Sequence, residues 1–135
     1  MISVENELFE PIATTLRAAF DGIYVSDEYV RQPPRFPAVF FEEVDNTVYH
    51  RGRDSSGIEN FSEVMYQVDV YSNLNRGKKA QAKTIMGMVD VMMAVYGFER
   101  TFMNPVQNLN DPTIYRMTAR YRAVVGKDKV VYSRR

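Results

Sequence analysis

The chain has 135 residues, 17 basic and 17 acidic side chains, one histidine and no cysteine. Its 45% hydrophobic and 13% aromatic content is typical of a folded globular protein and excludes a disordered chain. Without cysteine there are no disulfides, thiolate nucleophiles or zinc–thiolate sites. Because no Pro/Gly/Ser-rich linker separates two cores, we expect one domain over residues 1–135.

The formal net charge is zero, but the charges are unevenly distributed along the chain. Residues 1–50 are rich in acids and residues 111–135 are rich in bases. Such ends can attract other copies or charged partners, or they can lie side by side and neutralise each other. No apolar run approaches the ~20 residues that cross a bilayer, and the first residues lack signal-peptide features. We therefore expect a cytosolic protein without membrane contact.

The first element in the chain is an expected amphipathic helix over residues 3–20. Leu8, Ile12 and Leu16 recur there at helical spacing. Pro11 interrupts the pattern, because proline lacks a backbone donor and clashes with the preceding helical turn. We expect a kink at Pro11, or a helix that properly starts near it.

A short strand over 23–25 and a long hairpin are expected next. Segment 31–37 contains three prolines and should be an extended connector. Proline-rich segments also bind in aromatic grooves, but the simpler interpretation is that this one sets the direction of the next strand. The hairpin arms are predicted near 38–52 and 58–72, with a turn or bulge at Asp45-Asn46.

The centre of the chain is a strand that leads directly into a helix. Apolar residues alternate along the strand, so that one face is apolar: Val64, Tyr66, Val68 and Val70. Asn75 is the expected N-cap of the helix, and Gly97 should end it.

The second half of this helix is apolar around most of its circumference. From Ile85 to Tyr96 its only charged side chain is Asp90. A surface helix is normally apolar over a narrower arc, so this segment should be covered on more than one side. The second cover is either the first helix or another subunit, and the hypothesised oligomer seam comprises Met86, Met88 and Met93.

After this helix we expect a strand over 98–102, a loop over 104–112, a regular strand over 113–125 and a last short strand near 130–132. The element order α-β-β-β-α-β-β with hairpin-length connections predicts an α+β fold. It comprises an antiparallel or mixed sheet with two helices packed on one face.

Three arginines share one face of the 113–125 strand: Arg116, Arg120 and Arg122. Free guanidinium groups on an exposed sheet would suit phosphate or carboxylate binding. Cross-strand pairing with acids such as Glu63 or Asp69 explains the same pattern equally well. Because exposed charges contribute little to stability, changing all three to glutamine should leave the fold intact.

The carboxylates Glu42, Glu43 and Asp45 lie close together in the sequence. Neighbouring strand residues point to opposite faces, however, so Glu42 and Glu43 should not converge. His50 has no second histidine or cysteine at ligand spacing. We therefore assign no catalytic, cofactor-binding or metal-binding residues and expect a protein that is not an enzyme.

Segments 62–73, 77–83 and 108–116 resemble the tail terminator proteins of long-tailed bacteriophages, also called tail completion, minor tail or minor capsid proteins. Segments 31–37 and 44–49 extend the resemblance over most of the chain. It implies a small α+β subunit that forms a hexameric ring, caps the tail tube and contacts the head connector. It also implies a non-enzymatic virion protein of the tail or neck, made in the host cytoplasm, with DNA passing through the channel without sequence-specific binding.

Within that resemblance, the hypothesised partner or channel contacts are Arg116, Arg120 and Arg122, with Arg51 and Arg53 at the hairpin tip. The tip should be mobile in the free subunit and ordered on docking. Three alternatives remain open. They are a head-side neck protein (stopper or adaptor), a small nuclease that binds metal through Glu42, Asp45 and Asp69, and a host-interaction domain.

Overall fold

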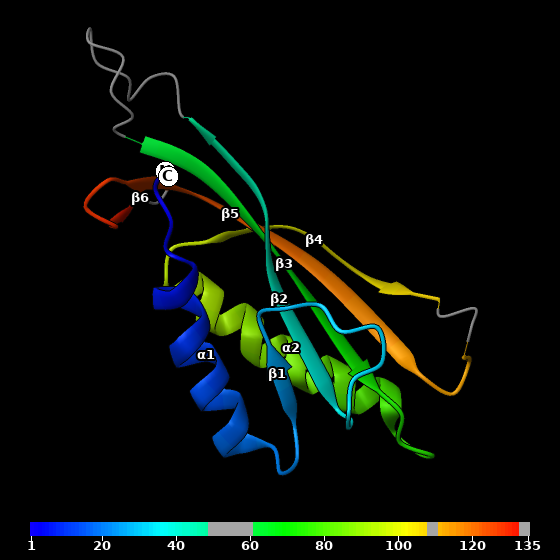
Figure 1. Ribbon diagram of the computed structural model, residues 1–135. Helices are drawn as coiled ribbons and strands as arrows, with labels where there is room; N and C mark the ends of the chain where they lie inside the picture. Colours follow the sequence, from blue (N-terminus) through cyan, green and yellow to red (C-terminus); the bar gives the residue numbers. More distant parts are fainter. Residues whose placement is uncertain (49–60, 108–110, 133–135) are drawn as a thin grey trace, which may run out of the picture.

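The computed structural model describes residues 1–48, 61–107 and 111–132 (Figure 1). Its elements are α1 (Glu5–Ala19), β1 (Tyr24–Ser26), β2 (Ala38–Val48), β3 (Phe61–Ser72), α2 (Lys78–Val95), β4 (Glu99–Val106), β5 (Tyr115–Gly126) and β6 (Val131–Tyr132). The predicted α+β fold with two helices on one face of a sheet is confirmed. The hairpin tip with Arg51 and Arg53 lies outside the described residues.

The sheet has the strand order β1-β2-β3-β5-β4, and β6 pairs with the end of β5. All pairs are antiparallel except β1 with β2, which makes the sheet mixed. Strand β1 is parallel to β2 because the connection over 27–37 carries the chain back to the end of the sheet where β1 began. The sheet is therefore not purely antiparallel. The bulge predicted at Asp45 is confirmed by a register shift between Glu43 and Asp45.

The hydrophobic core lies between the inner face of the sheet and the two helices. The predicted inward residues of β3 are fully buried: Val64, Tyr66, Val68 and Val70. The rings of Phe41 and Tyr66 stack with centroids 5.0 Å apart, joining β2 to β3. Neither helix of the described chain is long and apolar enough to span a bilayer.

Helix α1 begins at Glu5 and continues through Pro11, so the expectation that it starts near the proline is wrong. Leu8 precedes the proline and Ile12 and Leu16 follow it, and all three are buried. Burial on both sides of Pro11 stabilises the continuous helix despite the missing backbone bond.

Helix α2 begins later than the sequence pattern indicates. Gly77 is its N-cap residue, with φ 85°, and Asn75 lies in the preceding turn. The expectation that Asn75 caps the helix is therefore wrong, because the left-handed conformation at Gly77 sets the starting point of the helix. The predicted end is confirmed: α2 stops at Val95, and Gly97 adopts φ 87°.

Strand β4 extends through Pro105 to Val106, into the segment that was expected to be a loop. Proline is tolerated there because β4 is an edge strand, where the backbone N–H on the outer side has no ladder partner to lose.

At the opposite end of the sheet, the Lys129 ammonium contacts the Glu7 carboxylate of α1. This ion pair joins the basic C-terminal part of the chain to the acidic N-terminal part.

Candidate functional site

The face of the sheet opposite the helices, called the open face here, carries the arginines of β5. Because directly opposed residues of paired strands point to the same side, the register places Arg122, Met65 and Asp45 on this face. Alternate residues of β5, such as Ala119 and Tyr121, point into the core and are buried. The predicted two-faced pattern of this strand is confirmed.

Arg116 is held by an acid and an aromatic ring. Its Nε and Nη2 donate to Asp69 Oδ1 at 3.4 and 3.1 Å, and its guanidinium lies 5.4 Å from the centroid of the Tyr71 ring. The second carboxylate oxygen of Asp69 accepts a 3.0 Å bond from Gln67 Nε2. Asp69 is only 8% exposed, so these bonds supply the partners that a buried carboxylate needs.

Arg120 continues the same array one step along the strand. Its Nε donates to Gln67 Oε1 at 2.9 Å, and its guanidinium lies 5.7 Å from the centroid of the Phe102 ring. Gln67 therefore accepts from Arg120 and donates to Asp69, which connects the bonds of Arg116 and Arg120 into one network.

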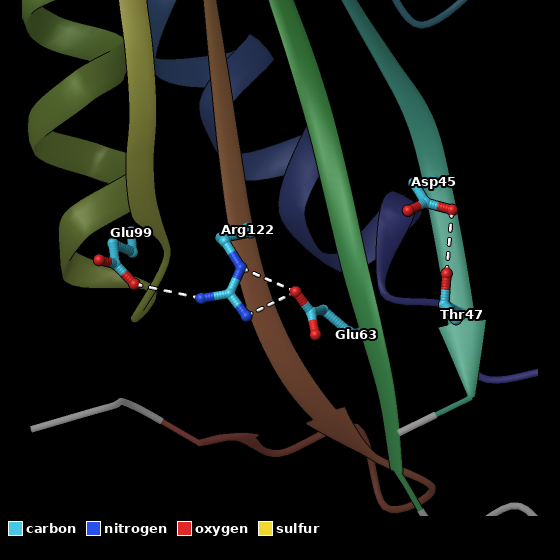
Figure 2. A network of polar contacts seen from close by, with 5 residues as sticks. All are labelled: Asp45, Thr47, Glu63, Glu99 and Arg122. Carbon is cyan, nitrogen blue, oxygen red and sulfur yellow. Dashed lines mark hydrogen bonds and ion pairs between the residues drawn. The ribbon is translucent and has the colours of Figure 1, made fainter. Parts of the chain in front are cut away.

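Arg122 bridges two acids from the strands on either side (Figure 2). Its Nε and Nη2 donate to Glu63 Oε1 at 2.8 and 2.5 Å, and its Nη1 lies 3.4 Å from Glu99 Oε2. Its side chain is only 17% exposed. Across β3 on the same face, Thr47 donates to Asp45 at 3.1 Å.

The arginine face is therefore not a free basic surface. Two of its arginines pair with Glu63 and Asp69, the acids that the sequence suggested as cross-strand partners. Among the residues of β2, β3, β4 and β5 on this face, acids outnumber bases: Glu42, Asp45, Glu63, Asp69 and Glu99 against Arg116, Arg120 and Arg122. Strong attraction of a phosphate backbone to this face is not expected, since it depends on unneutralised cations.

The acids proposed for a nuclease do not converge. Asp69 lies opposite Phe40, whereas Asp45 lies opposite Met65 further along the hairpin. Glu42, the third of these acids, lies opposite Gln67, between the other two. Its neighbour Glu43 points to the other side of the sheet, where its Oε1 accepts bonds from Tyr66 Oη at 3.2 Å and Asn46 Nδ2 at 3.3 Å. Across the described ranges, no group of three or more histidine or acidic side chains is arranged to hold a metal ion.

The buried stripe of α2 corrects the expected oligomer seam. Met86 and Met93 are completely buried in the subunit core, so in this conformation they cannot contact another subunit. Met88 is partly buried against the core. The accessible apolar residues are instead Val91 and Val95, whose exposed fractions are 64% and 77%. Hydrophobicity alone did not distinguish the two sides of the helix.

A groove of about 780 Å³ lies where the loop after β1 meets the segments that flank the β4–β5 connection. Residues from five parts of the chain line it, among them Tyr29, Arg31, Phe40, Tyr71, Gln107 and Arg116. Burial raises the pKa of Tyr71, an effect partly opposed by Arg116. The sequence pattern did not identify this groove. The one feature of the sequence that could have indicated it is the proline-rich connector, because such segments pack with aromatic side chains.

No protein-family model matches the chain, and no curated protein matches it. Three surfaces of the molecule bear on its function: the paired charges of the open face, the apolar outer side of α2 and the groove.

Proposed function

We propose that this chain is a structural virion-assembly subunit of the phage tail terminator type. Copies of it form a hexameric ring that caps the tail tube and presents a surface to the head connector. The α+β fold agrees with the fold that the resemblance implies. The observation that carries the proposal is the apolar stripe on the outer side of α2, centred on the exposed Val91 and Val95, because a ring subunit must bury such a surface against its neighbours.

The outer side of α2 carries residues at helical spacing that are small or apolar: Ala80, Thr84, Gly87, Val91, Ala94 and Val95. The solvent side of an ordinary surface helix is polar and charged. Val91 and Val95 expose most of their surface, and a Cβ built on Gly87 would meet no atom within 4 Å. The face is therefore both apolar and open to close approach.

A second copy of the chain is the occupant that fits this face best. Interfaces between subunits that stay together are more apolar than transient ones, and their centres are depleted of charge. Contact between α2 and a different surface of the next copy is head-to-tail, and such contacts form a ring when the rotation between copies closes. Contact of α2 with itself would instead give a two-fold dimer, which differs in mass from the hexamer.

In this arrangement the open face of the sheet is the axial surface that meets the tube or the connector. Arg116, Arg120 and Arg122 contribute to it as part of a paired charge array. The excess of acids on this face favours contact with protein over contact with the phosphates of passing DNA. The subunit would be made in the host cytoplasm and act in the tail or neck of the virion.

Native mass spectrometry and sedimentation velocity, with and without purified tail tubes, test the ring directly. We expect a hexamer in at least one of these conditions. Val91→Glu combined with Val95→Lys should shift the protein to monomer, because desolvating the two new charges opposes burial of the face. Val130→Glu is the matched control, because Val130 is also an exposed valine (48%) but lies near β6. Monomeric wild-type protein in both conditions would refute the ring.

Binding partners separate the tail side from the head side of the neck. The proposal requires the wild-type ring to bind purified tail tubes. Binding to portal or connector alone, with no binding to tubes, would identify the protein as the head-side neck protein instead.

A further inference from the structure

The groove at the end of the open face has the size and composition of a binding site. We propose that it binds an extended, acidic segment of a partner protein. An aromatic or proline side chain of the segment would lie on the aromatic residues at the floor of the groove, and a carboxylate would lie at Arg31. Its volume of about 780 Å³ is far larger than one side chain requires and falls within the ~300–1,000 Å³ typical of ligand sites.

The floor of the groove is a set of aromatic rings in contact. Phe40 lies at the centre, with ring centroids 5.8 Å from Tyr29 and 5.7 Å from Tyr71. Phe40 is 4% exposed, while Tyr29 is 67% exposed. The buried ring of Phe40 beside the exposed ring of Tyr29 offers apolar contact area, and few rotatable bonds must be immobilised on binding. This arrangement favours a flat or cyclic side chain.

Polar groups that have no partner among the described residues surround this floor. Arg31, Gln32 and Gln107 form no hydrogen bond or ion pair with any other described residue. Their donors are therefore available to the backbone and carboxylates of an extended peptide. Arg116 is already oriented by Asp69 and Tyr71, so it adds positive charge to the groove at a fixed position.

The charges around the groove favour an acidic ligand. The carboxylate of Asp69 is engaged by Arg116 and Gln67, and Asp111 Oδ1 accepts from the backbone and the hydroxyl of Thr113. These hydrogen bonds lower the pKa of Asp111, and the Lys78 ammonium contributes in the same direction. Asp69 is neutralised by Arg116, and the Lys78 ammonium offsets part of the charge of Asp111, which stays ionised. Arg31 has no acidic partner among the described residues, so its guanidinium is the group that a ligand carboxylate would meet.

A nucleic acid fits this site less well than a peptide. Stacking bases could use the aromatic floor, but the strand would continue onto the open face. The residues of β2, β3, β4 and β5 on that face include more acids than bases, and all three of their arginines are engaged, so this part of the face would attract a phosphate backbone poorly. The lining of the groove does not include Val91 or Val95 of α2, so peptide binding does not require the ring.

A selection from a random peptide display library on the immobilised wild-type chain tests the proposal. Enriched peptides should contain aspartate or glutamate next to phenylalanine, tyrosine or proline. A labelled enriched peptide should then bind in fluorescence anisotropy. We expect affinity losses of about tenfold for Tyr29→Ala and about fivefold for Arg31→Gln, the scale of truncating one anchor or one charged contact. Both side chains are exposed, so these variants should unfold at the wild-type temperature in circular dichroism.

Lys83→Gln is the matched control, because it removes one exposed cation from α2 and should leave peptide affinity unchanged. Val91→Glu should also bind normally, so that loss of the ring and loss of the groove are separate results. The proposal fails if no peptide is enriched, or if the enriched peptide binds Tyr29→Ala and Arg31→Gln as tightly as wild type. Competition by oligo(dT) at lower concentration than the peptide would assign the groove to nucleic acid and overturn the proposal.

Discussion

Removing Arg122 tests whether the paired charges of the open face stabilise the fold. Arg122→Met keeps the length and apolar stem of the side chain and removes the guanidinium. Glu63 and Glu99 then lose their partner, but their side chains are 38% and 65% exposed and can be hydrated. Breaking a fully buried ion pair costs roughly 3–5 kcal/mol, whereas exposed pairs contribute about 0–1 kcal/mol.

The 17% exposure of Arg122 places this pair between those limits. We expect the free energy of unfolding to fall by about 1.5 kcal/mol, of which about 1 kcal/mol should appear as coupling in a double-mutant cycle with Glu63→Gln. For a chain of this length that corresponds to a fall in Tm of about 6 °C. Changing all three arginines to glutamine should therefore destabilise the fold. The expectation that this triple change is harmless required free arginines.

Urea unfolding followed by circular dichroism provides the measurement, and Arg100→Met provides the control. Arg100 lies 3.4 Å from Asp90, but its side chain is 48% exposed. Its replacement should change the free energy of unfolding by less than about 0.5 kcal/mol. If Arg122→Met costs no more than the control and shows no coupling to Glu63, the reasoning is wrong and Arg122 behaves as a solvated residue.

Three further changes have expected outcomes. Burial, together with the nearby Glu43, raises the pKa of Tyr66 far above its usual value of about 10. The unfolded chain therefore loses this proton first, and the free energy of unfolding should fall as the pH rises above about 10. In alkaline urea titrations, Tyr66→Phe should reduce this dependence on pH by about 1.4 kcal/mol per pH unit. Phe41→Ala should cost about 3–5 kcal/mol in urea unfolding, because Phe41 is 2% exposed, and a loss below 1 kcal/mol would contradict its place in the core. Two glycine-to-alanine changes should act in opposite directions in thermal unfolding. Gly77→Ala should lower stability by about 1 kcal/mol because φ is 85°, whereas Gly87→Ala within α2 should raise it by about 0.5–1 kcal/mol. Equal effects of the two changes would contradict these conformations.

The sequence alone determined the order of the elements and the inward face of the central strands. The apolar residues from Val64 to Val70 alternate with mostly polar ones, and the 113–125 strand alternates in the same way, because the two sides of a strand meet different surroundings. The bulge near Asp45 and the end of α2 at Gly97 also follow from local chain chemistry. These features depend on residues that are close together in the chain.

Only the tertiary structure decided which of the possible long-range contacts form. The sequence indicated Glu63 and Asp69 as possible partners of the arginines, but only the pairing of β3 with β5 brings these side chains into contact. It could not indicate which side of α2 is buried, because methionine and valine occur on both sides of the helix. The groove joins Tyr29 to Gln107, which are far apart in the chain, and so it exists only after the sheet has brought the two loops to the same end. Local periodicity describes the faces of single elements, whereas pairing and packing between distant elements determine which faces meet.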